Sequence, residues 1–337
     1  MTPVVVLNGE LRLADDALVP LNGVLASFGE GALEVFRTTA HGPFLASRHL
    51  ARLRRTCERL GIPAEDAEQD LIHDLNVLSG AGKGPWRVRL IRSRFDSGAM
   101  RALIAETFTP SELLSTGARL TLREGIVTPL AIKTTSYVAS RVLRREALAA
   151  GFDECLLHLG GELMEGASSN IVLVIQDVLV SPTSPWILDG VTLQHVLQSA
   201  MDLGLETEHR PVALTELAGA DEVFMTSAIR GPIPVREVDG QKYRIGRVFD
   251  AVRQRYEADL QSDWGELQEE TVAGARDLIE NRLAKMGEVK GGDLLLEGES
   301  FLLRWSGEAL NIRLATPYAG GGGRLRALAK ALQDAHH

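Results

Sequence analysis

The sequence predicts an α+β protein, because runs with the alternation of strands and runs with helical spacing are mixed in both halves. The predicted strands are mostly joined by short hairpin turns; Asn8-Gly9, for example, is the favoured two-residue turn with positive φ. Hairpin connections favour this class over a doubly wound parallel sheet. At 337 residues the chain is long enough for two ordinary domains, and it contains no internal repeat.

Residues 1–110 are predicted to form a first α+β domain. Ser47 is expected to cap its first helix. Glycine-rich residues 80–85 are interpreted as a loop rather than a phosphate-binding P-loop, because no Ser or Thr follows Lys83. The predicted elements are the strands 4–7, 10–13 and 27–39, the helices 47–60 and 64–79, and the strands 86–92 and 102–107.

Residues 108–117, with Pro110 and small polar side chains, are predicted to link this half to a second domain at 118–261. Gly204 is placed where a helix commonly ends. The predicted strands of this domain are 118–124, 154–158, 163 onward, 171–175, 178–181, 210–214, 222–226 and 233–238, and its helices are 138–150, 189–203 and 246–260.

From about Ser262 the sequence changes character, and residues 262–337 are predicted to form a small appended α+β module of unassigned role. The glycines at 320–323 are interpreted as a hinge rather than a phosphate cradle. The module is predicted to contain a charged amphipathic helix at 264–286, strands at 293–296, 301–305 and 310–314, and a final helix.

The composition is that of a globular enzyme, with 45% hydrophobic and 24% charged residues. A formal net charge of −9 argues against a general nucleic-acid binder, which needs basic excess to neutralise phosphates. Cys57 and Cys155 lack metal-type spacing and are expected to be free thiols in a reducing compartment. With no membrane-length apolar run and no signal-type N-terminus, we expect a cytoplasmic protein without a membrane partner or a metal site.

Two stretches carry residues suited to one kind of chemistry. Lys133 follows an apolar approach and precedes Tyr137 by four residues. A desolvated lysine can form a Schiff base, although taken alone it is better explained as a surface lysine. Glu165 precedes five small or amide residues ending at Asn170, which would let a flat ring approach the backbone. A buried carboxylate there would face a pyridine nitrogen, although alone it is better explained as a turn residue.

A phosphate on the same cofactor requires hydrogen-bond donors and positive charge. Gly190-Val191-Thr192, at a predicted helix start, offers backbone N–H groups, the positive helix end and a hydroxyl. Ser227 follows a predicted strand and is suited to the same role, and Arg52 can supply a fixed positive charge. Each residue alone has an ordinary structural explanation, but their combination favours a cofactor site.

From about residue 5 to 260 the chain resembles the class-IV aminotransferases, the fold-type-IV pyridoxal-phosphate (PLP) enzymes. This family includes branched-chain aminotransferases, D-amino-acid aminotransferases and aminodeoxychorismate lyases. The matching stretches, in family order, are Phe28-Gly29-Glu30-Gly31-Ala32-Leu33-Glu34, His49-Leu50-Ala51-Arg52-Leu53, Lys133 with Tyr137, Glu165-Gly166 with Ser169-Asn170, Gly190-Val191-Thr192, and Phe224 to Gly231 with Pro234-Val235.

The resemblance implies a two-domain α/β fold with PLP between the domains, and a homodimer whose partner completes the substrate pocket. It implies that Lys133 binds PLP covalently and moves protons, that Glu165 pairs with the pyridine nitrogen, and that Tyr137 contacts the 3-hydroxyl side. Ser169 and Asn170 would lie beside the ring. The residues that would hold the phosphate are Arg52, Val191, Thr192, Ser227 and Ala228.

The substrate residues implied by the resemblance are less specific. They are Phe28, Glu34, Arg94 and Arg230. The chain departs from the family pattern at four places, which leave the substrate and the details of phosphate binding open. Those departures are Asn22 in place of an acid, Phe95 in place of glycine after Arg94, Ala228 in place of a hydroxyl or amide residue, and Leu193 in place of arginine.

The resulting hypothesis is a PLP-dependent class-IV aminotransferase that moves an amino group between an amino acid, of branched-chain or D-amino-acid type, and a 2-oxo acid. The alternative is 4-amino-4-deoxychorismate lyase, which releases pyruvate and 4-aminobenzoate in folate synthesis. The loop from Ser227 through Arg230 to Val235 looks more like that lyase subgroup. A remote alternative is a catalytically silent scaffold with the same fold.

Overall fold

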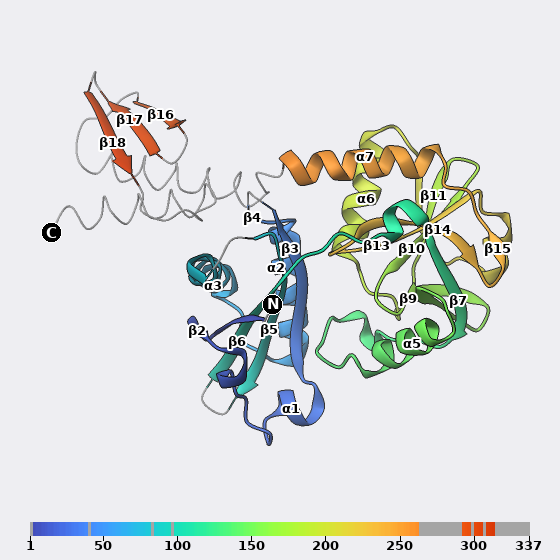
Figure 1. The fold of residues 1–337 in the computed structure, drawn as a ribbon, viewed down its shortest axis with the longest axis horizontal. Helices are drawn as coiled ribbons and strands as arrows, with labels where there is room; N and C mark the ends of the chain where they lie inside the picture. Colours follow the sequence, from blue (N-terminus) through green and yellow to red (C-terminus); the bar gives the residue numbers. More distant parts are fainter. Residues whose placement is uncertain are drawn as a thin grey trace.

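The computed structural model describes residues 3–39, 42–81, 84–95, 98–262, 292–297, 300–305 and 308–313. Two large β-sheets, each packed against helices, occupy most of this part of the chain (Figure 1). Helices and strands are mixed in both halves, which confirms the predicted α+β class. Among the described residues, no helix is long and apolar enough to cross a membrane.

The first sheet has six strands in the order β2-β1-β6-β5-β3-β4, and every neighbouring pair is antiparallel. Asn8 and Gly9 both have positive φ, as predicted for the β1–β2 turn. The short helix α1 was not predicted. The elements are β1 (Val4–Leu7), β2 (Glu10–Arg12), α1 (Val24–Phe28), β3 (Gly31–Thr39), β4 (Gly42–Pro43), α2 (Ala46–Leu60), α3 (Ala67–Ala81), β5 (Trp86–Phe95) and β6 (Gly98–Thr107).

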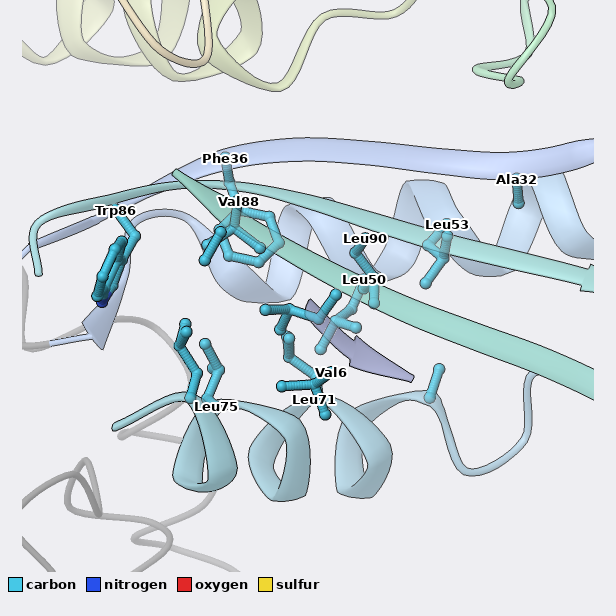
Figure 2. Close-up of a cluster of buried hydrophobic side chains, with 14 of the residues drawn as sticks. Val6, Ala32, Phe36, Leu50, Leu53, Leu71, Leu75, Trp86, Val88 and Leu90 are labelled. Carbon is cyan, nitrogen blue, oxygen red and sulfur yellow. The ribbon is translucent and has the colours of Figure 1, made fainter. Parts of the chain in front are cut away.

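Helices α2 and α3 bury one face of this sheet. Figure 2 shows Leu71 and Leu75 of α3 pointing toward Val88 and Leu90 of β5. The outward residues of β5 are exposed or half-buried between buried ones, which is the alternation of a strand with one covered face. Because α2 places residues three and four apart on one face, it buries Leu50, Leu53 and Cys57 together, and it also buries His49 and Arg52.

The second sheet has nine strands and mixed pairing. Its order is β12-β11-β10-β13-β14-β7-β8-β9, with β15 beside β14. Strands β7, β8 and β14 pair in parallel, as do β11 and β12. The elements are α4 (Leu113–Thr116), β7 (Ala118–Glu124), α5 (Val138–Ala149), β8 (Glu154–Leu159), β9 (Glu162–Gly166), β10 (Asn170–Ile175), β11 (Val178–Pro182), α6 (Val191–Asp202), β12 (Thr207–Arg210), β13 (Glu222–Ser227), β14 (Gly231–Val238), β15 (Gln241–Lys242) and α7 (Arg247–Ser262).

The turn between β4 and α2 joins the two halves. Phe44 and Leu45 belong to the first half of the chain but are buried in a core with Val196 of α6 and Tyr256 of α7. Phe44 meets the Tyr256 ring edge-on, at a centroid distance of 5.4 Å. The first half is therefore anchored by side chains inserted between the two helices that cover the second sheet.

Two local predictions were wrong. Ser47 does not cap α2, because the helix begins at Ala46 after Leu45, which has a positive φ of 54°. Leu45 takes this conformation while its side chain is buried, so tertiary packing sets the start of the helix. The strand predicted at 210–214 lies earlier, at Thr207–Arg210, because Pro211 has no N–H with which to extend the pairing.

A third, antiparallel sheet lies in the appended region. It consists of β16 (Gly292–Glu297), β17 (Ser300–Trp305) and β18 (Glu308–Arg313). These strands match the three predicted there, apart from Leu314, which is outside the described residues. The helices predicted at 264–286 and after 323 also lie outside the described residues.

Candidate active site

A cavity with a volume of about 320 Å³ lies where segments of both halves meet. Phe28 and Glu30, from the end of α1 and the approach to β3, line one side. The connection from β7 to α5 supplies Lys133 and its neighbours, and the turn after β9 supplies a third wall that begins at Glu165. Of the predicted site residues, five therefore line one cavity: Phe28, Lys133, Tyr137, Glu165 and Ser169.

Lys133 follows the second half's first strand in sequence but is attached to the first sheet. The Leu33 N–H donates to the Lys133 carbonyl at 2.9 Å, and the Thr135 N–H donates to the Gly31 carbonyl at 2.9 Å. The segment thus adds a short antiparallel bridge to the free edge of β3. The Lys133 Nζ donates to the Tyr137 hydroxyl at 2.5 Å, four residues on. The backbone and the amine are both held in place.

The approach to Lys133 contains an unusual backbone. Leu130 and Ala131 have φ values of 70° and 51°, in the left-handed region that costs a side-chain-bearing residue roughly 1–2 kcal/mol. Leu130 is also 57% exposed and lines the cavity. Strain of this kind persists only where the surroundings hold the chain, and here it immediately precedes the candidate reactive amine.

Glu165 lies in the third wall and is 4% exposed. The Thr128 hydroxyl donates to Oε1 at 2.5 Å, and the Leu188 N–H donates to Oε2 at 3.2 Å. Burial raises the pKa of Glu165 from 4.5 to about 7; the hydrogen bonds and the charges of Lys133 and Arg52 oppose this rise without cancelling it. An ionised Glu165 in this position would gain from a further cationic N–H donor.

Asn170, the predicted neighbour of this acid, does not line the cavity but supports it. Its Nδ2 donates to the Leu188 carbonyl at 2.9 Å and lies 3.4 Å from Glu165 Oε2. Gly190 makes this position available, because a Cβ there would overlap Asn170 Oδ1. The glycine before α6 is therefore needed for the packing around Glu165.

Arg52 is buried at the other end of the site. Its Nε and Nη2 donate to the two carboxylate oxygens of Glu34 at 2.7 and 2.8 Å, and its Nη1 donates to the Asp189 carbonyl at 2.9 Å. Asp189 precedes Gly190, the N-cap residue of α6. The guanidinium therefore lies beside a helix N-terminus, where backbone N–H groups and a positive dipole end favour an anion.

Glu34 is completely buried and does not line the cavity. The His49 ring lies 2.7 Å from its Oε2. Burial favours the neutral acid, but the charge and hydrogen bonds of Arg52, with those of His49, outweigh it and lower the pKa of Glu34 to about 2. Burial also lowers the pKa of His49, against the opposing hydrogen bond and charge of Glu34. We therefore place Glu34 as a support for Arg52 and not, as expected from the sequence, beside the substrate.

The other predicted phosphate residues do not line the cavity either. Val191 and Thr192 are buried in the first turn of α6, and Ser227 and Ala228 are half-buried where β13 ends. The neighbouring Thr226 hydroxyl is buried and has no hydrogen-bond partner within the part of the chain that the structure describes. A hydroxyl of this kind is a ready donor for an anion.

The two arginines predicted to meet the substrate are each paired with an acidic side chain of the protein. Arg94 is exposed, and its Nη2 lies 3.4 Å from the carboxylate of Glu30, which lines the cavity. Arg230 donates to Glu154 at 2.9 Å. Neither arginine lines the cavity.

Sequence reasoning missed several residues that shape the site. Thr128 and the Leu188 N–H act on Glu165 from separate loops, and no local pattern marks either one. Glu154 had a signal, since an acid that opens the apolar run Cys155 to Leu157 is unusual in a buried strand. His49 was quoted only as part of a motif.

Known proteins resemble the chain over this same region. The profile of the family described as "Amino-transferase class IV" matches residues 31–238. A probable branched-chain-amino-acid aminotransferase of Thermotoga maritima is 30% identical over 243 residues, which cover 70% of this chain and 87% of that protein. A D-alanine aminotransferase of Bacillus licheniformis is 29% identical over 251 residues, which cover 70% of this chain and 89% of that protein.

Among solved structures, a 4-amino-4-deoxychorismate lyase of Pseudomonas aeruginosa is similar with a TM-score of 0.67 and 26% identity. The match covers 76% of this chain and 99% of that structure. The family profile alone spans residues from β3 to the end of β14, which include Lys133 and Glu165. The chain belongs to the class IV aminotransferase family.

Proposed function

We propose that this protein is a PLP-dependent aminotransferase that moves an amino group between an amino acid and a 2-oxo acid. The observation that carries the proposal is the cavity in which the Lys133 amine is held by Tyr137 while buried Glu165 forms another wall. An amine and a carboxylate in one cavity suit a cofactor with an aldehyde and a basic ring nitrogen. Membership of the class IV family supports the same assignment.

The residues present fit PLP at both ends of the cofactor. At the ring end, Glu165 is a buried acid whose raised pKa of about 7 would be relieved by a protonated ring nitrogen. At the phosphate end, Arg52 lies beside the start of α6, where the N–H groups of Val191 and Thr192 are available. The unpartnered, buried Thr226 hydroxyl adds a donor at the end of β13. We assign Ser227 and Ala228 to the same phosphate contact.

When bound, PLP would supply the electron sink that weakens bonds at the substrate Cα. In this proposal Lys133 holds the cofactor and moves a proton at the substrate Cα, with Tyr137 orienting its amine. Glu165 keeps the ring nitrogen positive, and Ser169 borders the ring. Arg52 fixes the phosphate, so that the cofactor does not drift when Lys133 releases it.

Aliphatic amino acids are the substrates that we favour. The part of the cavity around Lys133 is lined by Val127, Leu130 and Ile132, which offer apolar contacts. The relatives named for branched-chain amino acids and D-alanine act on side chains of this kind. Phe28 adds an aromatic ring that is 75% exposed at the cavity edge.

The lyase remains a second candidate, favoured by the solved lyase with a matching fold and 26% identity. A product assay with the PLP-loaded protein separates the two. Amino transfer from an aliphatic amino acid to 2-oxoglutarate, without 4-aminobenzoate formation, is expected. Pyruvate and 4-aminobenzoate from aminodeoxychorismate, with no amino acceptor present, would instead establish the lyase.

A silent scaffold makes a different prediction, namely no visible absorption from the PLP-treated protein. We expect yellow protein, and loss of that absorption in Lys133→Ala, with Tyr137→Phe as a variant that keeps the amine.

We also propose a cytoplasmic homodimer. Three apolar side chains near the N-terminus, Leu13, Leu18 and Leu21, are more than 70% exposed and would suit contact with a second copy. Light scattering that reports a monomer would reject the dimer.

A further inference from the structure

A further buried glutamate, Glu154, lies between the two loops that flank the candidate cofactor site. Glu154 is the first residue of β8, and its side chain is 0% exposed. It accepts hydrogen bonds from the Ser168 N–H at 2.6 Å and from the Ser169 hydroxyl at 3.1 Å. Both serines line the cavity, so Glu154 holds the cavity wall that follows Glu165 from behind.

Arg230 connects the same carboxylate to the other loop. Its Nη2 donates to Glu154 Oε2 at 2.9 Å, and its side chain is 16% exposed. Its Nε lies 3.4 Å from the hydroxyl of Ser227, the residue that ends β13. One buried ion pair therefore joins the turn at Ser168 to the turn at Ser227.

The packing leaves little freedom in this arrangement. A Cβ on Gly166 would lie 2.9 Å from Glu154 Oε1 and would overlap the Ser169 hydroxyl. The turn can close over Glu154 only because residue 166 is glycine. Removing either member of the pair would leave an uncompensated charge inside the fold, which is far costlier than removing both. Arg230 donates to Glu154 and does not line the cavity.

We propose that Glu154 and Arg230 are positioning residues that set the ring-side turn and the phosphate-side turn relative to each other. This inference rests on the proposed function, since it assigns PLP to the space between these turns. Neither residue lines the cavity. They act through Ser168 and Ser169 on one side and through Ser227 on the other.

The test compares three variants: Glu154→Gln, Arg230→Met and the double substitution. PLP affinity is measured by titration, and the visible absorption and thermal unfolding of each loaded protein are recorded. Each single variant is expected to bind PLP roughly 10–100-fold more weakly. Losses of this size are typical when a residue that orients a directly binding residue is removed. The double variant is expected to lose less than the product of the two single losses, because it leaves no unpaired buried charge.

Arg92→Met is the matched control. Arg92 is buried and pairs with Asp70 at 2.6 Å on the first sheet, and neither residue lines the cavity. This variant is expected to lower thermal stability while its PLP affinity stays within twofold of the wild-type value.

Two results would overturn the proposal. The first is that Glu154→Gln and Arg230→Met keep the wild-type PLP affinity and absorption and lose only thermal stability. The pair would then have a structural role and no effect on the cofactor. A raised KM for the amino acid in Arg230→Met, with PLP affinity intact, would make Arg230 a substrate residue. Should Glu154→Gln fail to fold, Arg230→Lys carries the same expectation, because it keeps the charge and loses the guanidinium fork. A wild-type protein that binds no PLP would defeat the proposed function instead.

Discussion

Glu34 and Glu165 are both buried glutamates at the candidate site, yet their pKa values move in opposite directions. The pKa of Glu34 falls to about 2 because Arg52 and His49 supply charge and hydrogen bonds that outweigh burial. The pKa of Glu165 rises to about 7 because burial outweighs the opposing hydrogen bonds from Thr128 and the Leu188 N–H, both of which are uncharged donors. Glu34 thus has its counter-charge within the protein, whereas Glu165 would gain one from the protonated ring nitrogen of the proposed cofactor.

Removing the ion pair between Glu34 and Arg52 should have the largest effect on stability. In Glu34→Gln, Arg52 remains buried without a counter-charge, and we expect the free energy of unfolding to fall by about 3–5 kcal/mol above pH 4.5. Since the folded pKa of Glu34 is lowered to about 2, its contribution is present above the unfolded value of 4.5 and is lost as the pH falls toward 2. Urea unfolding of the wild type and the variant at pH 7 and pH 3 measures the loss of stability and its pH dependence. An equal loss of stability at the two pH values would contradict the pairing.

The stability contribution of Glu165 should depend on pH in the opposite sense. A rise in pKa from 4.5 to about 7 corresponds to about 3 kcal/mol of stability that the cofactor-free protein has below pH 4.5 and loses as the pH rises through 7. Glu165→Gln should therefore stabilise the cofactor-free protein by up to about 3 kcal/mol at pH 8, and change little at pH 4. The same variant should lower kcat by about 10²-fold or more, because its neutral amide cannot keep the ring nitrogen charged. A variant that is less stable at pH 8 would refute this account.

Asn170, which contacts Glu165, can be displaced without changing any charge. Gly190→Ala introduces a Cβ that overlaps Asn170 Oδ1, and we expect a loss of about 1–3 kcal/mol together with weaker PLP binding. Gly204→Ala is the control for stability, because within the described part of the chain no atom beyond its sequence neighbours lies within 4 Å of its Cβ position, although its φ of 77° makes alanine strained there too. Only the change at residue 190 should alter PLP affinity.

The smallest effect is expected at Thr128. Thr128→Val keeps the side-chain shape but removes the hydroxyl that donates to Glu165, which should raise the pKa of that acid further and cost about 1 kcal/mol at pH 8. Thr128→Ser restores a hydroxyl and should recover most of the loss. The measurement is the pH dependence of PLP affinity, whose acid limb should move to higher pH in the valine variant alone.

Much of the fold could be predicted from local patterns. The strands around Asn8-Gly9 and the one at Ala118–Glu124 follow from turn chemistry and alternation. The start of α2 could not be predicted, because Leu45 is held by a core built from residues about 150 positions later. The division at residues 110, 118 and 262 stays a prediction.

The candidate site divides in the same way. Lys133 and Glu165 were predicted because several motifs follow one another in the order of the class IV family, and the structure places both residues in one cavity. Thr128 and Glu154 were not, because their importance comes from contacts with residues 37 and 14 positions away. Glu34, predicted beside the substrate, is buried against Arg52 and does not line the cavity, since a motif gives the identity of a residue but not the direction in which its side chain points.

The bridge that attaches Lys133 to β3 has a mechanical consequence. The backbone of Lys133 is hydrogen-bonded to β3 of the first sheet, whereas Glu165 lies at the end of β9 in the second (Figure 1). A ligand that contacts both residues therefore spans the joint between the two sheets. Removing that ligand would also remove a contact that holds the two sheets together. The distance between the Lys133 amine and the Glu165 carboxylate therefore reports on how the two halves of the molecule are arranged.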